Sequence, residues 1–225
     1  MSSAHVMTQN YASSPIVIDH LFDAAARKMV AARLKRAIDL VGSGVGLILL
    51  APFFLLLIMA IRLESPGPAI FKQRRSGYLG ATFFIYKFRT MRVVEDGPDL
   101  VQASRDDARI TQLGRMMRRT SLDELAQLVN VFLGEMSLIG PRPHALAHDE
   151  YYGSMIPLYD ARFKVRPGIT GLAQVSGLRG PTEEISMMAA RVEKDLEYIR
   201  DWSLGLDLRI LLRTLVIFAL QPAAY

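Results

Sequence analysis

The sequence predicts a mostly helical α+β protein that is attached to a membrane. Three observations support this: a long uncharged apolar run, a stretch with the pattern of a β-hairpin, and several segments with helical spacing of apolar residues. The chain has 225 residues and a formal net charge of +5. This length allows one compact domain beside an anchor, and the basic charge is typical of chains that bind anionic membranes, phosphorylated substrates or nucleic acid. Because the anchor favours the first two, we expect no nucleic-acid partner.

The residues before the apolar run predict an arm and a helix. Residues 1–18 are polar and mixed, as in a flexible N-terminal arm. Residues 19–39 are rich in alanine, with apolar side chains at helical spacing and basic side chains between them. This pattern predicts a basic amphipathic helix on the membrane surface. The chain has no cysteine, which excludes disulfides and thiol chemistry.

The apolar run, Leu40 to Ile61, has no charged side chain. As a helix it would be roughly 33 Å long, enough to cross a hydrocarbon core of about 30 Å. Pro52 lies in its middle, and basic residues flank it on both sides. Since Lys and Arg collect in cytoplasmic loops, this predicts a re-entrant membrane helix over residues 40–62 that bends at Pro52, the position of the helix break, and returns to the same face. A single-pass anchor with an ordinary proline kink stays open as the alternative.

Residues 63–225 are predicted to form a catalytic domain at the cytoplasmic face of the membrane. Its first part reads as a short β-hairpin, with strands at residues 69–72 and 82–88 around a glycine-containing connection. A polar, acidic loop follows at residues 93–107, and then a basic helix or turn at residues 109–119.

The second part of this domain contains the remaining predicted helices. Residues 121–132 have one apolar face, and Ser121 with Glu124 three positions later matches a capping box. Two proline-containing turns follow at residues 137–144 and 166–171. Helices are predicted at residues 187–201 and 204–220. The last is apolar but carries charges, which favours packing on a membrane surface or in a core over spanning.

Asp123 and Glu124, at the start of a predicted helix, are the candidate catalytic residues. Backbone N–H groups at a helix N-terminus favour carboxylates and phosphates, so an ionised Asp123 could attack phosphorus while Glu124 binds a divalent cation. The alternative is that both only cap the helix. Basic side chains elsewhere in the domain suit phosphate binding. The candidate phosphate-binding or nucleotide-binding residues are Arg75, Lys87, Arg89, Arg118 and Arg142.

His144 and His148 stand four residues apart and could share a helix face. A metal site at this pair is the weaker interpretation, because no third ligand is evident; polar surface near a loop is the expected role.

Several motifs occur in a fixed order along the chain: KRAIDL, ESPGPAIFKQRRSG, FFIYKFRTM, RRTSLDEL, GEMSLIGPRPH and KVRPGITGLAQVSG. In these motifs the chain resembles the bacterial sugar transferase family, the monotopic phosphoglycosyl transferases. It resembles most the undecaprenyl-phosphate glucose phosphotransferase branch of exopolysaccharide synthesis. Two positions depart from the family pattern: Ala51 replaces a serine before the bending proline, and Ala126 replaces a proline after the acidic pair.

The resemblance implies transfer of a sugar 1-phosphate from a UDP-sugar to undecaprenyl phosphate, with magnesium, at the bacterial inner membrane. Asp123 would be the nucleophile that releases UMP, Glu124 the magnesium ligand, and Arg118 and Arg142 phosphate contacts. It also implies a re-entrant helix bent at Pro52. The branch favours glucose 1-phosphate as the transferred group, and galactose 1-phosphate or an N-acetylated sugar stays open. A non-enzymatic membrane adaptor of polysaccharide assembly is the alternative function. A homo-oligomer is possible.

Overall fold

The computed structural model describes residues 15–92, 107–180 and 184–220. The helices are α2 Pro15–Ala31, α3 Arg33–Glu64, α4 Gln112–Thr120, α5 Leu128–Leu133, α6 Leu146–Gly153, α7 Leu172–Val175, α8 Ile185–Asp201 and α9 Leu204–Leu220, with 3₁₀ turns η1 Tyr78–Gly80, η2 Leu122–Gln127 and η3 Tyr159–Lys164. The strands are β1 Ile70–Ser76, β2 Thr82–Phe88, β3 Ser137–Ile139 and β4 Gly168–Thr170. The prediction of a mostly helical α+β protein is confirmed.

Helix α2 differs from the prediction at both ends. Residues 15–18 belong to it rather than to the arm, and residues 1–14 lie outside the described part. The helix stops at Ala31 because Ala32 adopts an extended conformation, with φ −70° and ψ 92°. Residues 33–39 therefore begin α3, and the single helix predicted over residues 19–39 is wrong. The apolar face of α2 is buried against the core, through Phe22, Ala26 and Met29.

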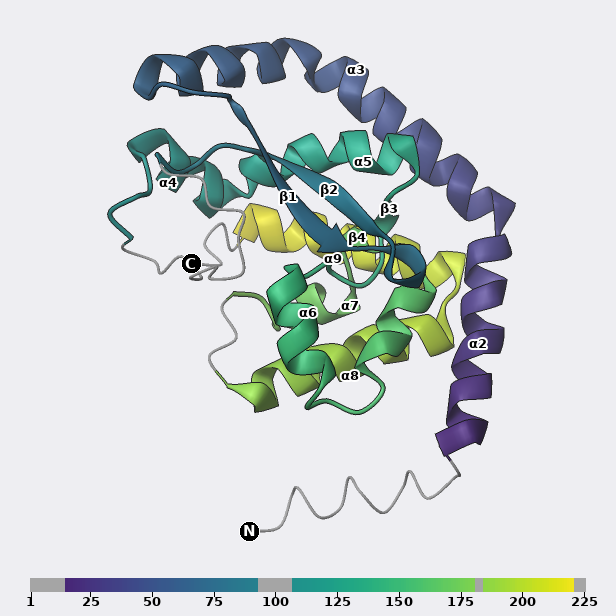
Figure 1. Cartoon of the computed structure of the whole chain (residues 1–225). Helices are drawn as coiled ribbons and strands as arrows, with labels where there is room; N and C mark the ends of the chain where they lie inside the picture. Colours follow the sequence, from purple (N-terminus) through teal and green to yellow (C-terminus); the bar gives the residue numbers. More distant parts are fainter. Residues whose placement is uncertain (1–14, 93–106, 181–183, 221–225) are drawn as a thin grey trace.

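Helix α3 contains the whole apolar run and arches along one side of the molecule, above β1, β2 and α5 (Figure 1). Among the described residues it alone is long and apolar enough to cross a membrane. Pro52 lies inside the helix and does not end it, so the helix is not interrupted at Pro52, while the bend predicted there stays a prediction. A proline removes one backbone hydrogen bond but a helix can continue through it with a bend.

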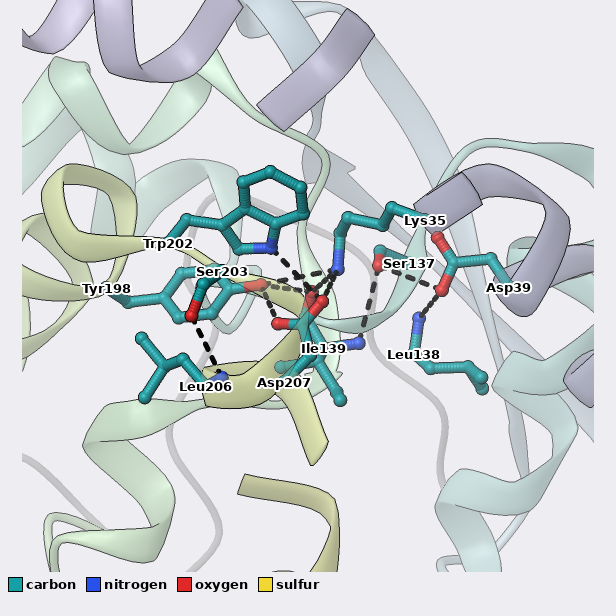
Figure 2. A network of polar contacts seen from close by, with 10 residues as sticks. All are labelled: Lys35, Asp39, Ser137, Leu138, Ile139, Tyr198, Trp202, Ser203, Leu206 and Asp207. Carbon is teal, nitrogen blue, oxygen red and sulfur yellow. Dashed lines mark hydrogen bonds and ion pairs between the residues drawn. The ribbon is translucent and has the colours of Figure 1, made fainter. Parts of the chain in front are cut away.

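Both ends of α3 are fixed to the same domain. At its start, Lys35 forms an ion pair of 2.7 Å with Asp207 of α9 (Figure 2). At its end, the Arg89 guanidinium donates to the Ser65 carbonyl over 2.6 Å, and the Leu113 amide donates to the Glu64 carboxylate over 2.9 Å. A straight helix of 32 residues would be about 48 Å long. The same domain therefore contacts two points of the chain that a straight helix would hold far apart.

Two glycines of the GSGVG segment let α3 pack closely against the domain. A Cβ at Gly42 would lie 2.9 Å from the Leu138 side chain, and one at Gly46 would lie 3.2 Å from Leu128. Gly42 and Gly46 therefore face β3 and α5. The opposite face of α3 leaves large apolar side chains exposed, including Ile48, Leu49, Leu55 and Leu63.

The predicted hairpin is confirmed, with β1 extending four residues further than expected. β1 and β2 pair antiparallel, with Ile70 opposite Phe88 and Ser76 opposite Thr82. The predicted turns around residues 137–144 and 166–171 contain a second sheet, in which β3 and β4 pair in parallel. Gly140 and Gly168 permit this contact, because a Cβ at Gly168 would lie 2.1 Å from the Gly140 nitrogen. Helix α9 has the predicted bounds, and α8 starts two residues earlier than predicted.

Candidate active site

A cavity of 460 Å³ lies where the hairpin, η2, the loop after β3 and helix α9 meet. Asp123 and Glu124 line it together with a larger number of cationic side chains, so that positive charge predominates on its walls. The lining cations are Arg75, Lys87, Arg89, Arg109, Arg118, Arg142, Arg179 and Arg191. Such a surface suits an anionic ligand that carries more than one negative charge.

Asp123 and Glu124 lie on the 3₁₀ turn η2, immediately after α4 ends. Ser121 takes the left-handed conformation, with φ 52°, and this reverses the chain between α4 and η2. Its side chain makes no capping hydrogen bond, so the predicted capping box is wrong. The physical reason is competition: the Glu124 carboxylate is held by Lys87 and Arg142 and does not reach back to the turn.

Glu124 is ionised within a triad of opposite charges. Lys87 Nζ donates to Oε1 over 3.0 Å, and the Arg142 guanidinium donates to both carboxylate oxygens, over 2.9 Å to Oε2. Burial alone would raise the pKa of Glu124, but the charges of Arg142 and Lys87 hold it well below its ordinary value. The Glu124 carboxylate thereby fixes two cations from distant parts of the chain. Lys87 comes from strand β2, and Arg142 comes from the loop after β3.

Asp123 has the opposite electrostatic environment from its neighbour. Its side chain is only 9% exposed, and burial, followed by the negative charge of Glu124, raises its pKa from 3.8 to about 6. Lys87, Arg118 and Arg142 lower the pKa but do not offset the burial. Asp123 is therefore ionised at neutral pH yet poorly solvated, which is the state that suits a carboxylate nucleophile.

The loop that carries Arg142 is supported by a buried ion pair that the sequence did not reveal. Arg162 of η3 and Asp195 of α8 pair over 2.8 Å, with side chains 3% and 2% exposed. The same Arg162 donates to the Arg142 carbonyl over 2.6 Å. Arg162 therefore fixes the backbone of the residue that binds Glu124.

Arg118 and Arg75 both reach the cavity wall, as predicted. Arg118 projects from α4, and its Nε donates to Thr90 Oγ1 over 3.0 Å. Arg75 lies on β1, where it contacts Gln73 and, over 3.4 Å, the Pro143 carbonyl. These contacts orient the two side chains along the cavity wall.

Arg89 also borders the cavity, but its guanidinium has a structural role. It is 4% exposed and donates to the carbonyls of Ser65 and Pro66, over 2.6 Å and 2.8 Å. These acceptors lie just beyond the end of α3. The terminal nitrogens of Arg89 therefore hold the end of α3 on the domain, and phosphate binding by Arg89 stays a prediction.

One of the two histidines, His144, has a different environment from the one expected. His144 is 6% exposed, so the prediction of polar surface is wrong for it. Its Nδ1 lies 2.8 Å from the Tyr159 hydroxyl, which itself donates to Asp149 over 2.7 Å, and 3.1 Å from the Arg162 guanidinium. Burial, followed by the charge of Arg162, holds the pKa of His144 well below its usual value. Within the described ranges no group of three His, Asp or Glu side chains could hold a metal.

Two further cations at the cavity, Arg179 and Arg191, had no signal in the sequence. Each is a single arginine without a recognisable motif, and only the fold places it in the cavity that Asp123 also lines. Arg191, on α8, donates to the Gly180 carbonyl over 3.0 Å and so supports the segment that carries Arg179.

Comparison with known proteins gives consistent matches. Residues 30–221 match the family model described as bacterial sugar transferase. A UDP-glucose:undecaprenyl-phosphate glucose-1-phosphate transferase of Caulobacter vibrioides is 54% identical over 191 residues, which are 85% of this chain and 72% of that protein.

Two other relatives extend this comparison. A transferase of the same description from Escherichia coli is 47% identical over 85% of this chain, and the chain covers 41% of that protein. The exopolysaccharide production protein PSS of Rhizobium leguminosarum is 46% identical over 81% of this chain and 94% of its own length. The chain thus spans less than half the length of the E. coli relative and nearly all of the Rhizobium one.

Proposed function

Because the chain belongs to the bacterial sugar transferase family, whose members are phosphoglycosyl transferases, we propose that it transfers glucose 1-phosphate from UDP-glucose to undecaprenyl phosphate in exopolysaccharide synthesis. The observation that carries this proposal is Asp123: a buried carboxylate with a raised pKa in a cavity whose walls are mostly cationic. The choice of glucose is supported by the Caulobacter and E. coli relatives, which are named as UDP-glucose:undecaprenyl-phosphate glucose-1-phosphate transferases.

The proposed reaction has two phosphoryl-transfer steps at one phosphorus atom. In the first, an oxygen of Asp123 attacks the sugar-side phosphorus of the UDP-sugar, the bond from that phosphorus to the bridging oxygen breaks, and UMP leaves. In the second, a phosphate oxygen of the lipid attacks the same phosphorus and displaces the Asp123 carboxylate. The product is a lipid diphosphate sugar, and the enzyme regains its free carboxylate.

The residues around Asp123 suit this reaction. Phosphoryl transfer depends mainly on positioning and on neutralising charge around the phosphorus. Arg118 and Arg142 lie on the same cavity wall as Asp123. We propose that these two guanidinium groups bind the donor's phosphates, since a planar guanidinium can contact two phosphate oxygens at once.

Magnesium is part of the proposal as an ion that arrives with the donor. Mg²⁺ commonly takes one or two protein carboxylates and completes its shell with substrate phosphates and water. Glu124 and Asp123 offer two adjacent carboxylates, which fits this pattern, and Glu124 is the proposed protein ligand. The ion would neutralise charge on the pyrophosphate. Glu124 would share its carboxylate between the ion and Lys87 or Arg142, which now contact it.

We also propose that α3 is re-entrant, entering and leaving the membrane on the cytoplasmic face of the inner membrane. The support is that one domain contacts both ends of the helix, at Lys35 and at Glu64, while the middle exposes apolar side chains. A single-pass helix would place its ends on opposite sides of the bilayer, and one domain could then not contact both.

Single cysteines at the two ends of α3 test the re-entrant arrangement. Because the chain has no cysteine, Arg33→Cys and Arg62→Cys each introduce a unique label site at an exposed position. We expect both to react with a membrane-impermeant maleimide in inside-out vesicles and neither to react in intact cells. Leu79→Cys, exposed on the catalytic domain, is the matched reference for the cytoplasmic side. If one end reacted only in inside-out vesicles and the other only in intact cells, the re-entrant arrangement would be refuted.

The proposed reaction itself is tested by UMP release. Purified protein with undecaprenyl phosphate, Mg²⁺ and a panel of UDP-sugars should release UMP fastest with UDP-glucose, and EDTA should suppress release at least tenfold because the pyrophosphate charge is then unbalanced. Faster UMP release with UDP-galactose or a UDP-N-acetyl sugar would show that the donor is not UDP-glucose, while the proposed reaction would stand. Absence of UMP with every donor, from folded protein, would favour a non-enzymatic adaptor of polysaccharide assembly.

A further inference from the structure

The cavity that contains Asp123 has two chemically different parts. One part holds Asp123, Glu124 and the surrounding cations. The other part is lined mainly by apolar side chains of α5, the short parallel sheet, the loop after α7 and α9, with Thr170, Gln174 and Thr214 among them. We call this part the apolar half; the residues that define it are Leu128, Leu138, Ile169, Leu178, Leu211 and Phe218.

Helix α9 forms one wall of the apolar half and brings it to the protein surface. Leu211, Thr214 and Phe218 line the cavity at i, i+3 and i+7, so they share one face of α9. Thr214 is fixed on this face by a 2.8 Å hydrogen bond with Thr170. Leu211 and Phe218 are 39% and 36% exposed, so the apolar half opens to the outside along α9.

The surface next to this opening is itself apolar. Leu208, Leu212 and Leu215 project from the neighbouring face of α9 and are each more than half exposed. An exposed apolar helix face beside an open apolar cavity is suited to contact with the hydrocarbon boundary of a membrane. A lipid chain could therefore pass from the bilayer along α9 into the cavity without crossing water.

Arg179 lies at the junction of the two parts. Its guanidinium stands 4.9 Å from the centre of the Phe218 ring, in a cation–π contact, and it lines the cavity with Arg142. Burial and the nearby charge of Arg142 lower the pKa of Arg179, which agrees with its place beside the cationic part. A ligand with an anionic head and an apolar chain would match this order of charge and apolar surface.

We propose that the apolar half binds the first isoprene units of the polyprenyl phosphate acceptor, with its phosphate directed toward Arg179 and Arg142. This rests on the proposed function, because it assigns a place to the acceptor of that reaction. The chain enters along α9, and the phosphate reaches the phosphorus carried by Asp123 from the apolar side of the cavity. The donor's nucleotide then occupies the cationic part.

The test compares truncation of the cavity-lining side chains of α9 with truncation of exposed apolar side chains away from the cavity. The variant Leu211→Ala/Phe218→Ala removes apolar surface from the proposed site, and we expect the KM for undecaprenyl phosphate to rise about tenfold or more, as follows from roughly 0.8 kcal/mol per buried CH₂. The burst of UMP formed without acceptor should change less than twofold. The matched control, Met155→Ala/Met187→Ala, removes exposed apolar side chains that do not line the cavity and should leave the acceptor KM within twofold.

The outcomes separate this assignment from the proposed function. An unchanged acceptor KM in the first variant, or an equal rise in the control, overturns the prenyl site while leaving the transferase reaction intact. If wild-type protein forms no UMP, the proposed function fails; binding of farnesyl phosphate, measured by calorimetry in detergent, then decides the prenyl site alone. A tenfold weaker Kd in the first variant, with the control unchanged, would support it, and equal affinities would reject it. Thermal melting shows that each variant is folded.

Discussion

Replacing Asp123 by asparagine should abolish UMP release, with a loss of about 10⁴-fold or more, as is typical when a nucleophile is removed. Asparagine keeps the size of the side chain but cannot form the phosphosugar intermediate. The measurement is a single-turnover assay with UDP-glucose, followed by a search for the covalent phosphosugar adduct by mass spectrometry. Wild-type protein should carry the adduct, and the Asp123→Asn variant should not.

A loss of activity through unfolding would look different. Asp123 is buried beside the ionised Glu124, and removing one of two adjacent negative charges relieves their repulsion. The variant should therefore melt no lower than wild type. The matched control is Asp160→Asn, which removes a carboxylate from the described part of the domain away from the cavity and should retain UMP release within twofold. Substantial UMP release by Asp123→Asn would assign the nucleophile elsewhere.

The pH dependence gives a second readout of the same assignment. The pKa of Asp123 is about 6, and only the ionised form attacks phosphorus. Activity at low substrate should therefore be constant above this pKa and fall about tenfold per pH unit below it. A nucleophile with the ordinary aspartate pKa would keep its activity down to about pH 4. The measured profile thus distinguishes the buried Asp123 from an exposed carboxylate.

Local motifs explain why much of the site could be predicted. Arg118, Asp123 and Glu124 stand within seven residues, and Arg142 lies between two prolines, so each has a signature in the sequence itself. The structure brings all four to one cavity. Asp195, Arg162 and Arg179 lack such a signature, because each acts through a contact between segments far apart in the chain. The 2.8 Å pair of Arg162 with Asp195 spans 33 positions.

The errors share a physical cause: a local pattern was overridden by a stronger distant partner. Ser121 and Glu124 have capping-box spacing, but two cations attract the Glu124 carboxylate away from the turn. The parallel pair β3–β4 joins strands of three residues each that lie about thirty positions apart, too short for a periodic signal. The middle of α3, by contrast, was predicted as a helix because residues 40–61 form a long run without a charged side chain.

The network that fastens the start of α3 illustrates how a distant partner can determine stability (Figure 2). Lys35 Nζ donates to Asp207 over 2.7 Å and to the Ile139 carbonyl over 3.0 Å. Asp207 also accepts from Tyr198 over 2.7 Å and from Trp202 over 3.1 Å. Every donor and acceptor around this buried ion pair is thus satisfied by helices α8 and α9 or strand β3.

Replacing Lys35 by methionine should destabilise the protein by about 3–5 kcal/mol, the usual cost of removing one partner from a buried ion pair. Methionine fills a similar volume, so the loss comes from the Asp207 carboxylate, which keeps two neutral donors but no balancing charge. Thermal melting in detergent should show a fall of roughly 10 °C, given about 2–4 °C per kcal/mol for a chain of this size. Arg33→Met, at an exposed position two residues earlier, is the matched control and should change stability by less than about 0.5 kcal/mol.

The double variant Lys35→Met/Asp207→Asn tests whether charge imbalance is the cause. Because it removes both charges, it should be destabilised by less than the sum of the two single variants, with a coupling of about 1–3 kcal/mol. Strict additivity would show that Lys35 stabilises the protein through packing alone. If the ion pair holds α3 in place, Lys35→Met should also increase proteolysis between α2 and α3 at temperatures where Arg33→Met is resistant. That result would identify the buried pair as the anchor of the membrane helix on the catalytic domain.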